Sequence, residues 1–278
     1  MGTKIRIQDL LEEYKAMNFD QALNHEKFNL YSIVHHSTAI EGSSLSELET
    51  SLLLDEGVVS AKRSFHDHLT VKDHYEALVF TFAQARKKES VTVSLLQEIA
   101  GLVMKNTGRE IKAYGGKDFD ESRGELRTIS VTAGAGDASY LKPERVPDAF
   151  KSLCTGINTA LTRALTVEEQ ILLSFDAHFN FETIHPFGDG NGRTGRLLMN
   201  YIQVYFGLPP AIIRKENKSA YIAVLIASRE QNDLEPIRAF LFKEYSDQLR
   251  TEIDRFKEDE KKSLGQISKM IQMMGQPI

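Results

Sequence analysis

The twelve residues from 185 to 196, HPFGDGNGRTGR, constrain the fold more than any other stretch of this 278-residue chain. Upstream of them, a capping box begins at Thr166, and apolar residues recur at helical intervals until Pro186 ends the helix. Downstream, a second apolar helix begins near Asn191 and ends at Gly207. The fold must therefore present a glycine-rich loop between two packed helices.

The rest of the chain carries mostly helical signals. A second capping box, from Ser44 to Glu47, predicts a helix that runs to Gly57. Apolar periodicity predicts helices over residues 71–87, 92–106, 148–163 and 219–229, and a long helix from about Pro236 into the charged run FKEDEKK. The last dozen residues, ISKMIQMMGQPI, fit either a short amphipathic helix or a frayed tail. The predicted fold class is mainly α.

One region breaks the helical pattern. Between Gly124 and Pro143, β-branched residues stand on both sides of Gly-Ala-Gly-Asp, which predicts a short β-hairpin. An irregular surface loop is the alternative for this region. With the hairpin, the predicted architecture is helical with one small β element.

Composition restricts the function classes. The net charge of -5 and the pI near 5.9 argue against a nucleic-acid-binding protein, whose domain is normally basic. The start of the chain lacks the apolar core of a secretory signal, and the longest uncharged apolar stretch, residues 197–213, contains prolines and amides. The single cysteine, Cys154, cannot form an internal disulfide and lies in an apolar helical stripe. We therefore expect a cytoplasmic protein without nucleic-acid or membrane partners.

The glycine-rich loop predicts a phosphate site. Arginine at the start of a helix is electrostatically misplaced, because the unpaired N–H groups there already carry positive charge. Arg193 and Arg196 are three residues apart, so they share a helix face and can hold one polyanion. Gly190, Gly192 and Gly195 remove side chains that would keep a phosphate from the backbone N–H groups.

Two further side chains complete the predicted chemistry. Asp189 beside phosphates is repelled by them unless a divalent cation lies between, and Mg²⁺ bound by one carboxylate and substrate phosphates fits. His185 lies just outside the phosphate loop, where a neutral imidazole can take a proton from an attacking hydroxyl. We expect Pro186 and Phe187 to stiffen and anchor the loop.

Each of these residues has a simpler interpretation when taken alone. A histidine before proline is commonly a capping or core residue, Asp-Gly is commonly a turn, and arginine is commonly solvated. The conjunction of all of them favours the phosphate site. Residues 190–195 also match G-x-G-x-x-G, but a dinucleotide-binding turn follows a buried strand, whereas this loop follows a capped helix. The chain has no P-loop or protein-kinase motif.

The loop resembles the Fic motif, HPFx[D/E]GNGRxxR, at every defined position. The similarity extends upstream through AHFNFETIHPF and, more loosely, over residues 30–245. It implies a mainly helical Fic-type fold with a short β-hairpin flap. It also implies an enzyme that transfers AMP from ATP to a Ser, Thr or Tyr hydroxyl of a protein and releases pyrophosphate.

The resemblance assigns roles within the motif. His185 is similar to the base that deprotonates the target hydroxyl, and Asp189 to the acidic residue that holds Mg²⁺ against the α- and β-phosphates. Asn191 and the N–H groups around it resemble the anion hole, and Arg193 and Arg196 resemble the residues that hold the rest of the triphosphate. The whole segment implied to bind ATP comprises Asp189, Gly190, Asn191, Gly192, Arg193, Thr194, Gly195 and Arg196.

Two elements outside the motif also resemble parts of the family's ATP site. The predicted hairpin corresponds to the flap, and its residues over the nucleotide are Val131, Thr132, Ala133 and Gly134. An edge strand there could pair with an extended segment of the target protein. Tyr221 resembles the residue on the adenine side, although relatives often show two consecutive tyrosines and Ile222 follows here.

A second motif predicts regulation. Residues Ser37 to Gly42, STAIEG, fit the inhibitory pattern [ST]xxxE[GN] of many Fic proteins. Ser37 and Glu41 share a helix face, and a glutamate at a helix C-terminus needs a cation from outside the helix. The resemblance nominates Arg196, which could not orient the γ-phosphate while paired with Glu41. A surface glutamate beside a turn is the alternative.

The resemblance also organises the chain. Residues 1–70 are expected to be N-terminal helices that carry the inhibitory motif, 71–250 the Fic core, and 251–278 a C-terminal helical tail, packed as one unit. The leading hypothesis is an autoinhibited protein adenylyltransferase with ATP, Mg²⁺ and a target protein as partners. The alternatives are a Fic-fold de-AMPylase, a transferase of another nucleotide or phosphate-containing group, and a nucleotide-sensing binding module. The frequent dimers of the family make a homodimer an alternative to a monomer.

Overall fold

The computed structural model describes residues 6–17, 25–132 and 140–274, and the structural statements below refer to these ranges. Helices dominate, which confirms the predicted mainly α class, and one small antiparallel sheet accompanies them. In chain order the elements are α1 (Ile7–Ala16), α2 (His25–Ile40), α3 (Glu47–Glu56), α4 (Phe65–Arg86), α5 (Val93–Val103), β1 (Glu110–Ile111), β2 (Phe119–Asp120), α6 (Val146–Leu161), α7 (Val167–Ile184), α8 (Asn191–Tyr205), α9 (Lys218–Gln231) and α10 (Glu235–Met274).

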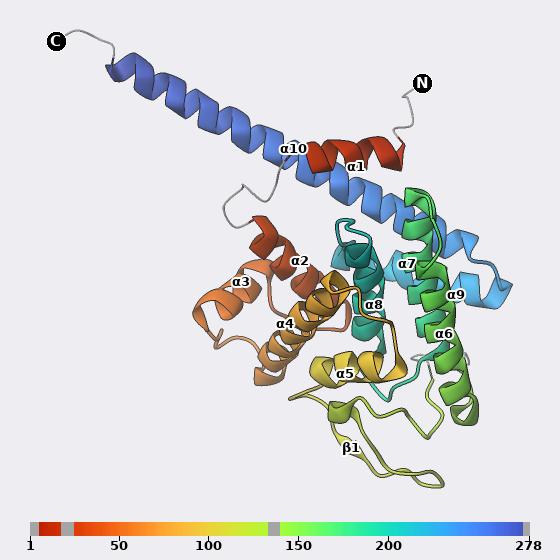
Figure 1. Ribbon diagram of the computed structural model, residues 1–278. Coiled ribbons are helices and arrows are strands. Elements are labelled where there is room, and N and C mark those ends of the chain that lie inside the picture. The colour runs from red at the N-terminus through yellow and green to blue at the C-terminus, as the bar shows by residue number, and fades with distance from the viewer. Residues whose placement is uncertain (1–5, 18–24, 133–139, 275–278) are drawn as a thin grey trace.

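The antiparallel pair α7 and α8 lies at the centre of the fold, and it carries the glycine-rich loop between its two helices. Buried apolar side chains form two clusters that both include residues of these helices. One cluster contains Leu78 of α4, Phe150 of α6 and Leu197 of α8. The other contains Phe175 of α7 and Tyr245 of α10. Figure 1 shows α10 running across this core, beside α1, and extending well beyond it.

Capping explains where several helices begin. At α7 the Thr166 hydroxyl accepts the Glu169 N–H at 3.3 Å, and the Glu169 carboxylate accepts the Thr166 N–H at 2.7 Å, as predicted. The second capping box was misplaced by two residues, because α3 is capped by Ser46 and Glu49. Two Ser-x-x-Glu patterns overlap in this stretch, and the Ser44 hydroxyl instead donates to Asp67 at 2.5 Å.

The structure describes only part of the predicted hairpin over residues 124–143. The only strands among the described residues lie upstream, where Glu110 pairs with Asp120 and Ile111 with Phe119. Within the predicted region, Thr132 forms an isolated β-bridge, and residues 125–131 follow an irregular path. The expected turn falls on residues 133–139, outside the described ranges. The backbone of residues 125–129 is held instead by contacts to the glycine-rich loop, described below.

Helix boundaries differ in two informative places. α4 begins at Phe65, six residues before the predicted start, because Ser64 accepts the Asp67 N–H and caps it. α10 is continuous to Met274, so most of the terminal dozen residues extend the long helix. Neither predicted alternative, a separate short helix or a frayed tail, describes them. Cys154 is buried in the first core cluster, as predicted.

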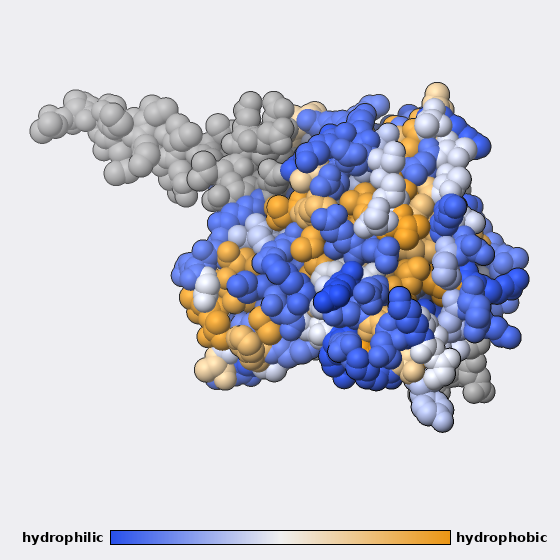
Figure 2. Space-filling view, turned by 60° about the horizontal axis from the view of Figure 1, so that its bottom comes forward, coloured by the Kyte–Doolittle hydropathy of each residue, from blue (hydrophilic) through white to orange (hydrophobic). Residues whose placement is uncertain are grey.

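The surface adds two observations. Large apolar side chains are exposed on and after α3, namely Leu48, Val58, Val59 and Phe65. Figure 2 shows apolar residues gathered on that side of the molecule. No described helix combines the length and the apolar character that a membrane-crossing segment requires.

Candidate active site

The glycine-rich loop is closed by its own side chains. His185 ends α7 in the left-handed conformation, at φ 51°, and its N–H donates to the Phe181 carbonyl at 2.8 Å. Gly190 caps α8 at φ 77°. The Asn191 amide donates to the Phe187 carbonyl at 2.9 Å and accepts the Phe187 N–H at 3.0 Å. The Asn191 side chain therefore holds the loop together, and an anion would meet main-chain N–H groups here rather than this amide.

Buried side chains fix the loop to the body. Phe187 is 2% exposed and packs edge-on against Phe150, with ring centroids 5.8 Å apart, and at a tilt against Phe181, with centroids 6.1 Å apart, which bears out its expected anchoring role. Arg127 is also buried, and its guanidinium donates to backbone carbonyls on both sides of the site. The acceptors are His185 at 2.6 Å, Ile129 at 2.8 Å, Ile184 at 3.4 Å and Leu141.

The His185 imidazole is largely buried but remains partly accessible to solvent. Its side chain is 17% exposed, and the Tyr140 ring stacks on it with centroids 3.7 Å apart and planes inclined by 10°. The Arg229 guanidinium lies 4.8 Å from the Tyr140 ring centroid. Burial, with the charge of Arg127, lowers the pKa of His185 to about 4. The imidazole is therefore neutral at pH 7, as a general base must be.

Asp189 presents a carboxylate to solvent at the mouth of the loop. Its side chain is 62% exposed and lies 3.8 Å from Arg193. One oxygen accepts the Gly190 N–H at 2.5 Å, which leaves the other oxygen free of protein hydrogen bonds among the described contacts. The described residues contain no group of three or more metal-ligating side chains. A single exposed carboxylate suits Mg²⁺, which takes its remaining ligands from water and substrate phosphates.

Arg193 is buried with an incomplete set of partners. It is 5% exposed, and its guanidinium donates weakly to the Val103 carbonyl at 3.5 Å and to the Met104 sulfur at 3.1 Å. Its Nε–H finds no hydrogen-bond acceptor in the described part of the chain. A buried guanidinium with an unused donor is costly, and an anion at the start of α8 would complete its hydrogen bonds.

Arg196 is bound by both predicted inhibitory residues. Ser37 lies on α2, and Glu41 directly follows that helix. It is 4% exposed, and it donates to the Ser37 hydroxyl at 2.9 Å, the Ser37 carbonyl at 2.9 Å and Glu41 at 2.7 Å. Burial raises the pKa of Glu41, but the charges of Arg196 and Arg193 outweigh it, so the net pKa lies below the usual value. Glu41 is therefore ionised at pH 7.

The loop glycines are required by what lies against them. A Cβ at Gly192 would overlap the Glu41 carboxylate, so this carboxylate lies directly on the N-terminus of α8. A Cβ at Gly195 would come within 2.7 Å of Glu182 and 3.1 Å of His178. The spacing of the glycines thus reflects close packing of charged groups as well as access to backbone N–H groups.

The remaining predicted ATP-site residues differ in how far they are exposed. Tyr221 is 2% exposed, and its hydroxyl lies 2.6 Å from His178, so it belongs to the core beneath Arg196 and presents no open face to an adenine. Thr194 is fully buried. Val131 and Thr132 are described and at least partly exposed, whereas Ala133 and Gly134 lie outside the described residues.

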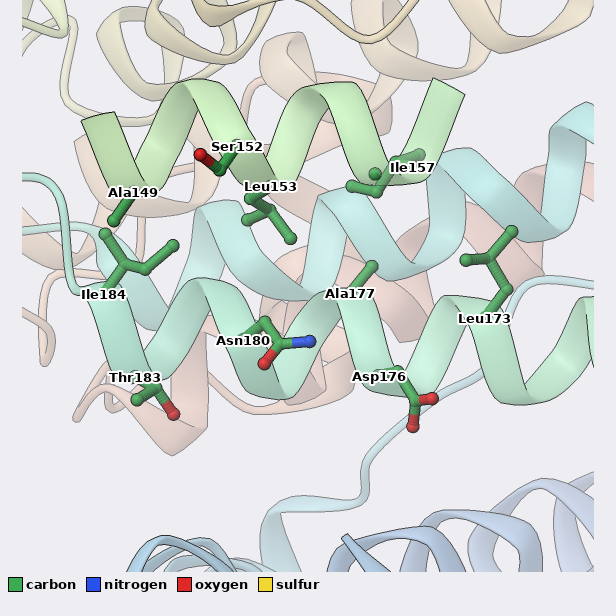
Figure 3. A pocket seen from close by; sticks show the side chains of 11 residues that line it. Ala149, Ser152, Leu153, Ile157, Leu173, Asp176, Ala177, Asn180, Thr183 and Ile184 are labelled. Atoms are coloured by element: carbon green, nitrogen blue, oxygen red, sulfur yellow. The ribbon is translucent and has the colours of Figure 1, made fainter. Parts of the chain in front are cut away.

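A separate pocket of about 370 Å³ lies between α6 and α7. Figure 3 shows Leu153 and Ile157 from α6 facing Leu173 from α7, with Asn180 at one side. Asp176 on its rim is already paired with Arg238, at 2.8 and 2.6 Å. The pocket includes no residue of the glycine-rich loop, so it is not part of the candidate active site.

Sequence patterns did not reveal three residues that shape the site. Arg127 and Tyr140 lie in the irregular region before α6 and reach His185 only through the fold. Met104 follows α5 and contacts Arg193. An arginine between apolar residues, in LRTI, was the one signal that Arg127 could have a buried role.

Comparisons of sequence agree with the motif. The Fic/DOC family model matches residues 90–203. The chain is 30% identical over 240 residues to protein adenylyltransferase fic-1 of Caenorhabditis elegans, covering 85% of this chain and 44% of that protein. It is 29% identical over 213 residues to protein adenylyltransferase Fic of Nematostella vectensis, covering 75% and 45%. The chain thus spans less than half the length of these curated relatives.

Comparisons of structure agree with the fold. A Fic-domain-containing signalling protein from Bacteroides thetaiotaomicron superposes with a TM-score of 0.75 at 27% identity, covering 90% of this chain and 96% of that one. A fragment of Fic-1 from C. elegans superposes with a TM-score of 0.71 at 26% identity, covering 92% and 72%. Motif, family model and fold agree on the helices around the glycine-rich loop, and residues 90–203 of the chain form a Fic/DOC-family domain.

Proposed function

We propose that this protein is a protein adenylyltransferase, which transfers AMP from ATP to a Ser, Thr or Tyr hydroxyl of a target protein. The observation that carries the proposal is the loop between α7 and α8. It combines a neutral, partly exposed His185 imidazole with two buried arginines at a helix N-terminus. The names of the curated relatives support the same activity.

In this mechanism the acceptor hydroxyl gives its proton to His185 as its oxygen attacks the α-phosphorus of ATP. The main-chain N–H groups at the start of α8 and the guanidinium of Arg193 face the negative charge that develops. Asp189 would hold Mg²⁺, which neutralises phosphate charge when bound. Because the loop is fixed by Asn191 and Arg127 beforehand, little reorganisation accompanies the reaction.

We propose further that the protein rests in a restrained state. Arg196 is bound on α2 by Ser37 and Glu41, and the Glu41 carboxylate occupies space beside Gly192. A carboxylate at this position repels an incoming triphosphate and withholds the arginine that would bind it. Displacement of Glu41 would free both the space and Arg196.

Several finer features remain proposals. The target protein could pair with the edge of the segment around Val131 and Thr132. The exposed apolar side chains on and after α3 offer a surface for a homodimer, because monomers seldom leave several large apolar groups together in water. The organisation into residues 1–70, 71–250 and 251–278, and a cytoplasmic location without nucleic-acid or membrane partners, also stay predictions.

Removal of AMP from a modified protein is the second candidate function. It is favoured by the Glu41 carboxylate, which is 37% exposed beside the loop and could orient a water molecule toward a bound phosphate ester. A transferase of another nucleotide and a nucleotide-sensing module are further alternatives. A pure binding module has no use for a neutral His185 at the rim.

The test uses isotope-labelled ATP with a lysate as the source of targets, and modification of the protein itself as a second readout. His185→Ala should abolish transfer and leave ATP binding intact, because the base contributes about 10²- to 10⁴-fold. Equal transfer by His185→Ala and the parent protein would refute the proposed role. Pre-labelled target incubated without ATP separates removal of AMP from its transfer.

A further inference from the structure

Glu182 is a buried carboxyl group that the mechanism above does not use. It lies one turn before His185 on α7, and its side chain is 8% exposed. Its Oε2 is 3.8 Å from the Nδ1 of His185. Among the described residues, the Oε1 of Glu182 and the Nδ1 of His185 are buried without a hydrogen bond of good geometry, and the backbone of Glu182 also interacts with the His185 ring. A neighbouring carboxyl group and imidazole that are both incompletely hydrogen-bonded are unlike most buried polar groups, which find partners.

The surroundings leave Glu182 few other partners. The Nε2 of His178 lies 2.6 Å from the Tyr221 hydroxyl, and its Nδ1 is buried without a partner. The position of a Cβ at Gly195 would be close to both Glu182 and His178, so α8 closes this space from one side. The carboxyl group is therefore enclosed by α7 and α8, with the His185 ring as its neighbour at the glycine-rich loop.

Charges from several elements act on this carboxyl group. Burial raises the pKa of Glu182 to about 7, Arg196 on α8 and Arg229 on α9 oppose the rise, and Glu41 beyond α2 adds to it. Tyr140 and Tyr221 also face it and are uncharged at this pH. Glu182 can thus exchange between its acid and its carboxylate near neutral pH.

The orientation of the His185 ring makes this exchange matter. The Tyr140 stack fixes the plane of the ring at 3.7 Å, and the Nδ1 edge is buried on the Glu182 side. A target hydroxyl must therefore approach the other edge, where Nε2 lies. Nε2 has a free lone pair only in the tautomer that carries the ring proton on Nδ1.

We propose that Glu182 is a positioning residue for the catalytic base: its carboxylate accepts the Nδ1–H of His185 and thereby keeps Nε2 free to take a proton. The inference rests on the proposed transferase function. The present distance is longer than a hydrogen bond, and such contacts commonly tighten when substrate binds. During transfer the acceptor O–H breaks, its oxygen bonds to the α-phosphorus as pyrophosphate leaves, and the proton stays on Nε2 until water takes it. The carboxylate stabilises the imidazolium through Nδ1 meanwhile.

The protonated form of Glu182 has the opposite effect. A carboxylic acid donates its hydrogen to Nδ1, and the ring proton then lies on Nε2, so the lone pair needed for the reaction is lost. The pair therefore couples the state of the base to pH around neutrality. The base is competent above the pKa of Glu182 and incompetent below it.

An NMR experiment on the intact wild-type protein tests this without any activity. Histidine labelled with ¹⁵N gives ring signals that report the tautomer, and the absence of one set of signals in His185→Ala identifies those of His185. We expect the ring proton on Nδ1 at pH 8 and a shift toward Nε2 at pH 6. In Glu182→Gln the tautomer should not change over this range, and a wild-type tautomer that is constant from pH 6 to pH 8 would overturn the proposal.

Transfer kinetics give a second readout, in the Glu41→Gly background. Glu182→Gln should lower kcat at pH 8 by at least about 10-fold, below the ceiling of roughly 10⁴-fold for loss of a carboxylate behind a catalytic histidine. The KM for ATP should stay within about twofold, because no phosphate contact is removed. The rise of kcat with pH should vanish in Glu182→Gln and persist in the control Glu168→Gln, an exposed glutamate on the same helix. If Glu182 had a merely structural role, Glu182→Gln would leave the pH profile of kcat unchanged. If the protein showed no transfer but the tautomer of His185 still changed with pH, the result would contradict the proposed transferase function and not the role of Glu182.

Discussion

Replacement of Glu41 by glycine isolates the contact that we propose to restrain the enzyme. The substitution removes the carboxylate from Arg196 and from its position over Gly192, and it leaves both hydrogen bonds from Arg196 to Ser37 in place. Glu41 already follows the last residue of α2 and lies in a turn, so glycine there does not interrupt the helix. The expected effect is a gain of transfer together with a loss of stability.

The size of the gain follows from the contact. A hydrogen bond between charged partners contributes about 1.5–3 kcal/mol, and the lower part of that range applies because the Glu41 side chain is 37% exposed and screened by water. A loss of about 1.5–2 kcal/mol raises the fraction of molecules with Arg196 available by roughly 10- to 30-fold, since 1.4 kcal/mol corresponds to tenfold. Adding Ser37→Ala removes a further bond of about 1 kcal/mol and should increase transfer again.

The same change should destabilise the fold. Arg196 is 4% exposed, and without Glu41 its buried charge loses its nearest carboxylate and keeps the Ser37 oxygens as hydrogen-bond acceptors. A cost of about 1.5–2 kcal/mol lowers the Tm by several degrees in a protein of this size, at roughly 2–4 °C per kcal/mol. Greater activity with lower stability distinguishes release of a restraint from a general improvement of the enzyme.

The assay measures incorporation of labelled AMP and the thermal transition on the same preparations. Glu56→Gly, at an exposed glutamate that ends α3, is the matched control and should leave transfer unchanged. Transfer by Glu41→Gly at the parent rate, with ATP affinity also unchanged, would show that the contact between Glu41 and Arg196 does not restrain the enzyme. A gain of transfer that persists in the double variant with His185→Ala would show that the label enters by another route.

Three further predictions concern the support of the site. Arg127→Ala should cost about 3 kcal/mol or more in unfolding free energy and reduce transfer, because buried carbonyls lose their donor, whereas Arg123→Ala, 75% exposed, should be neutral in urea unfolding. Phe187→Ala should cost about 3–5 kcal/mol in the same assay, and Leu48→Ala, at 69% exposure, less than about 0.5. Burial lowers the pKa of His178 to about 3, so the folded state resists protonation that the unfolded state accepts below 6.5. Stability should therefore fall as pH drops from 6.5 toward 3, by about 1.4 kcal/mol per pH unit, and His178→Gln should remove that part of the slope.

The features that sequence predicted well depend on neighbouring residues. The start of α7, the turn at His185 and the start of α8 follow from a capping box, a proline and glycines within one stretch of chain. Phe187 was expected to anchor the loop, and its ring is buried between aromatic side chains of α6 and α7. The pairing of Glu41 with Arg196 was also predicted, although 155 residues separate them. Local electrostatics indicated only that Glu41 needs a cation, and the resemblance to the family identified that cation as Arg196.

The features that sequence missed depend on distant contacts. Arg127 and Tyr140 meet His185 only after the irregular segment before α6 folds against the loop, and no periodicity marks them. The region around them was predicted as a hairpin because β-branched residues flank glycines. In its described part, residues 125–131 follow an irregular path, and the Arg127 guanidinium donates to the Ile129 carbonyl. The resemblance to relatives suggested Tyr221 for the adenine side, and in the structure its hydroxyl lies 2.6 Å from His178.

The arrangement of charges explains why one helix N-terminus can serve both inhibition and catalysis. Arg193 and Arg196 are buried at the positive end of α8, an arrangement that is unfavourable until an anion joins it. Glu41 supplies that anion from within the chain, and the triphosphate would supply it from outside. The two therefore compete for the same positively charged site at the N-terminus of α8. The folded protein without nucleotide therefore favours the bound carboxylate. Because Glu41 also raises the pKa of Glu182, its departure would favour the Glu182 carboxylate and with it the competent tautomer of His185. Release of the restraint and preparation of the base would then be one event, which the pH profiles of the Glu41→Gly and parent proteins should report as a lower inflection in the variant.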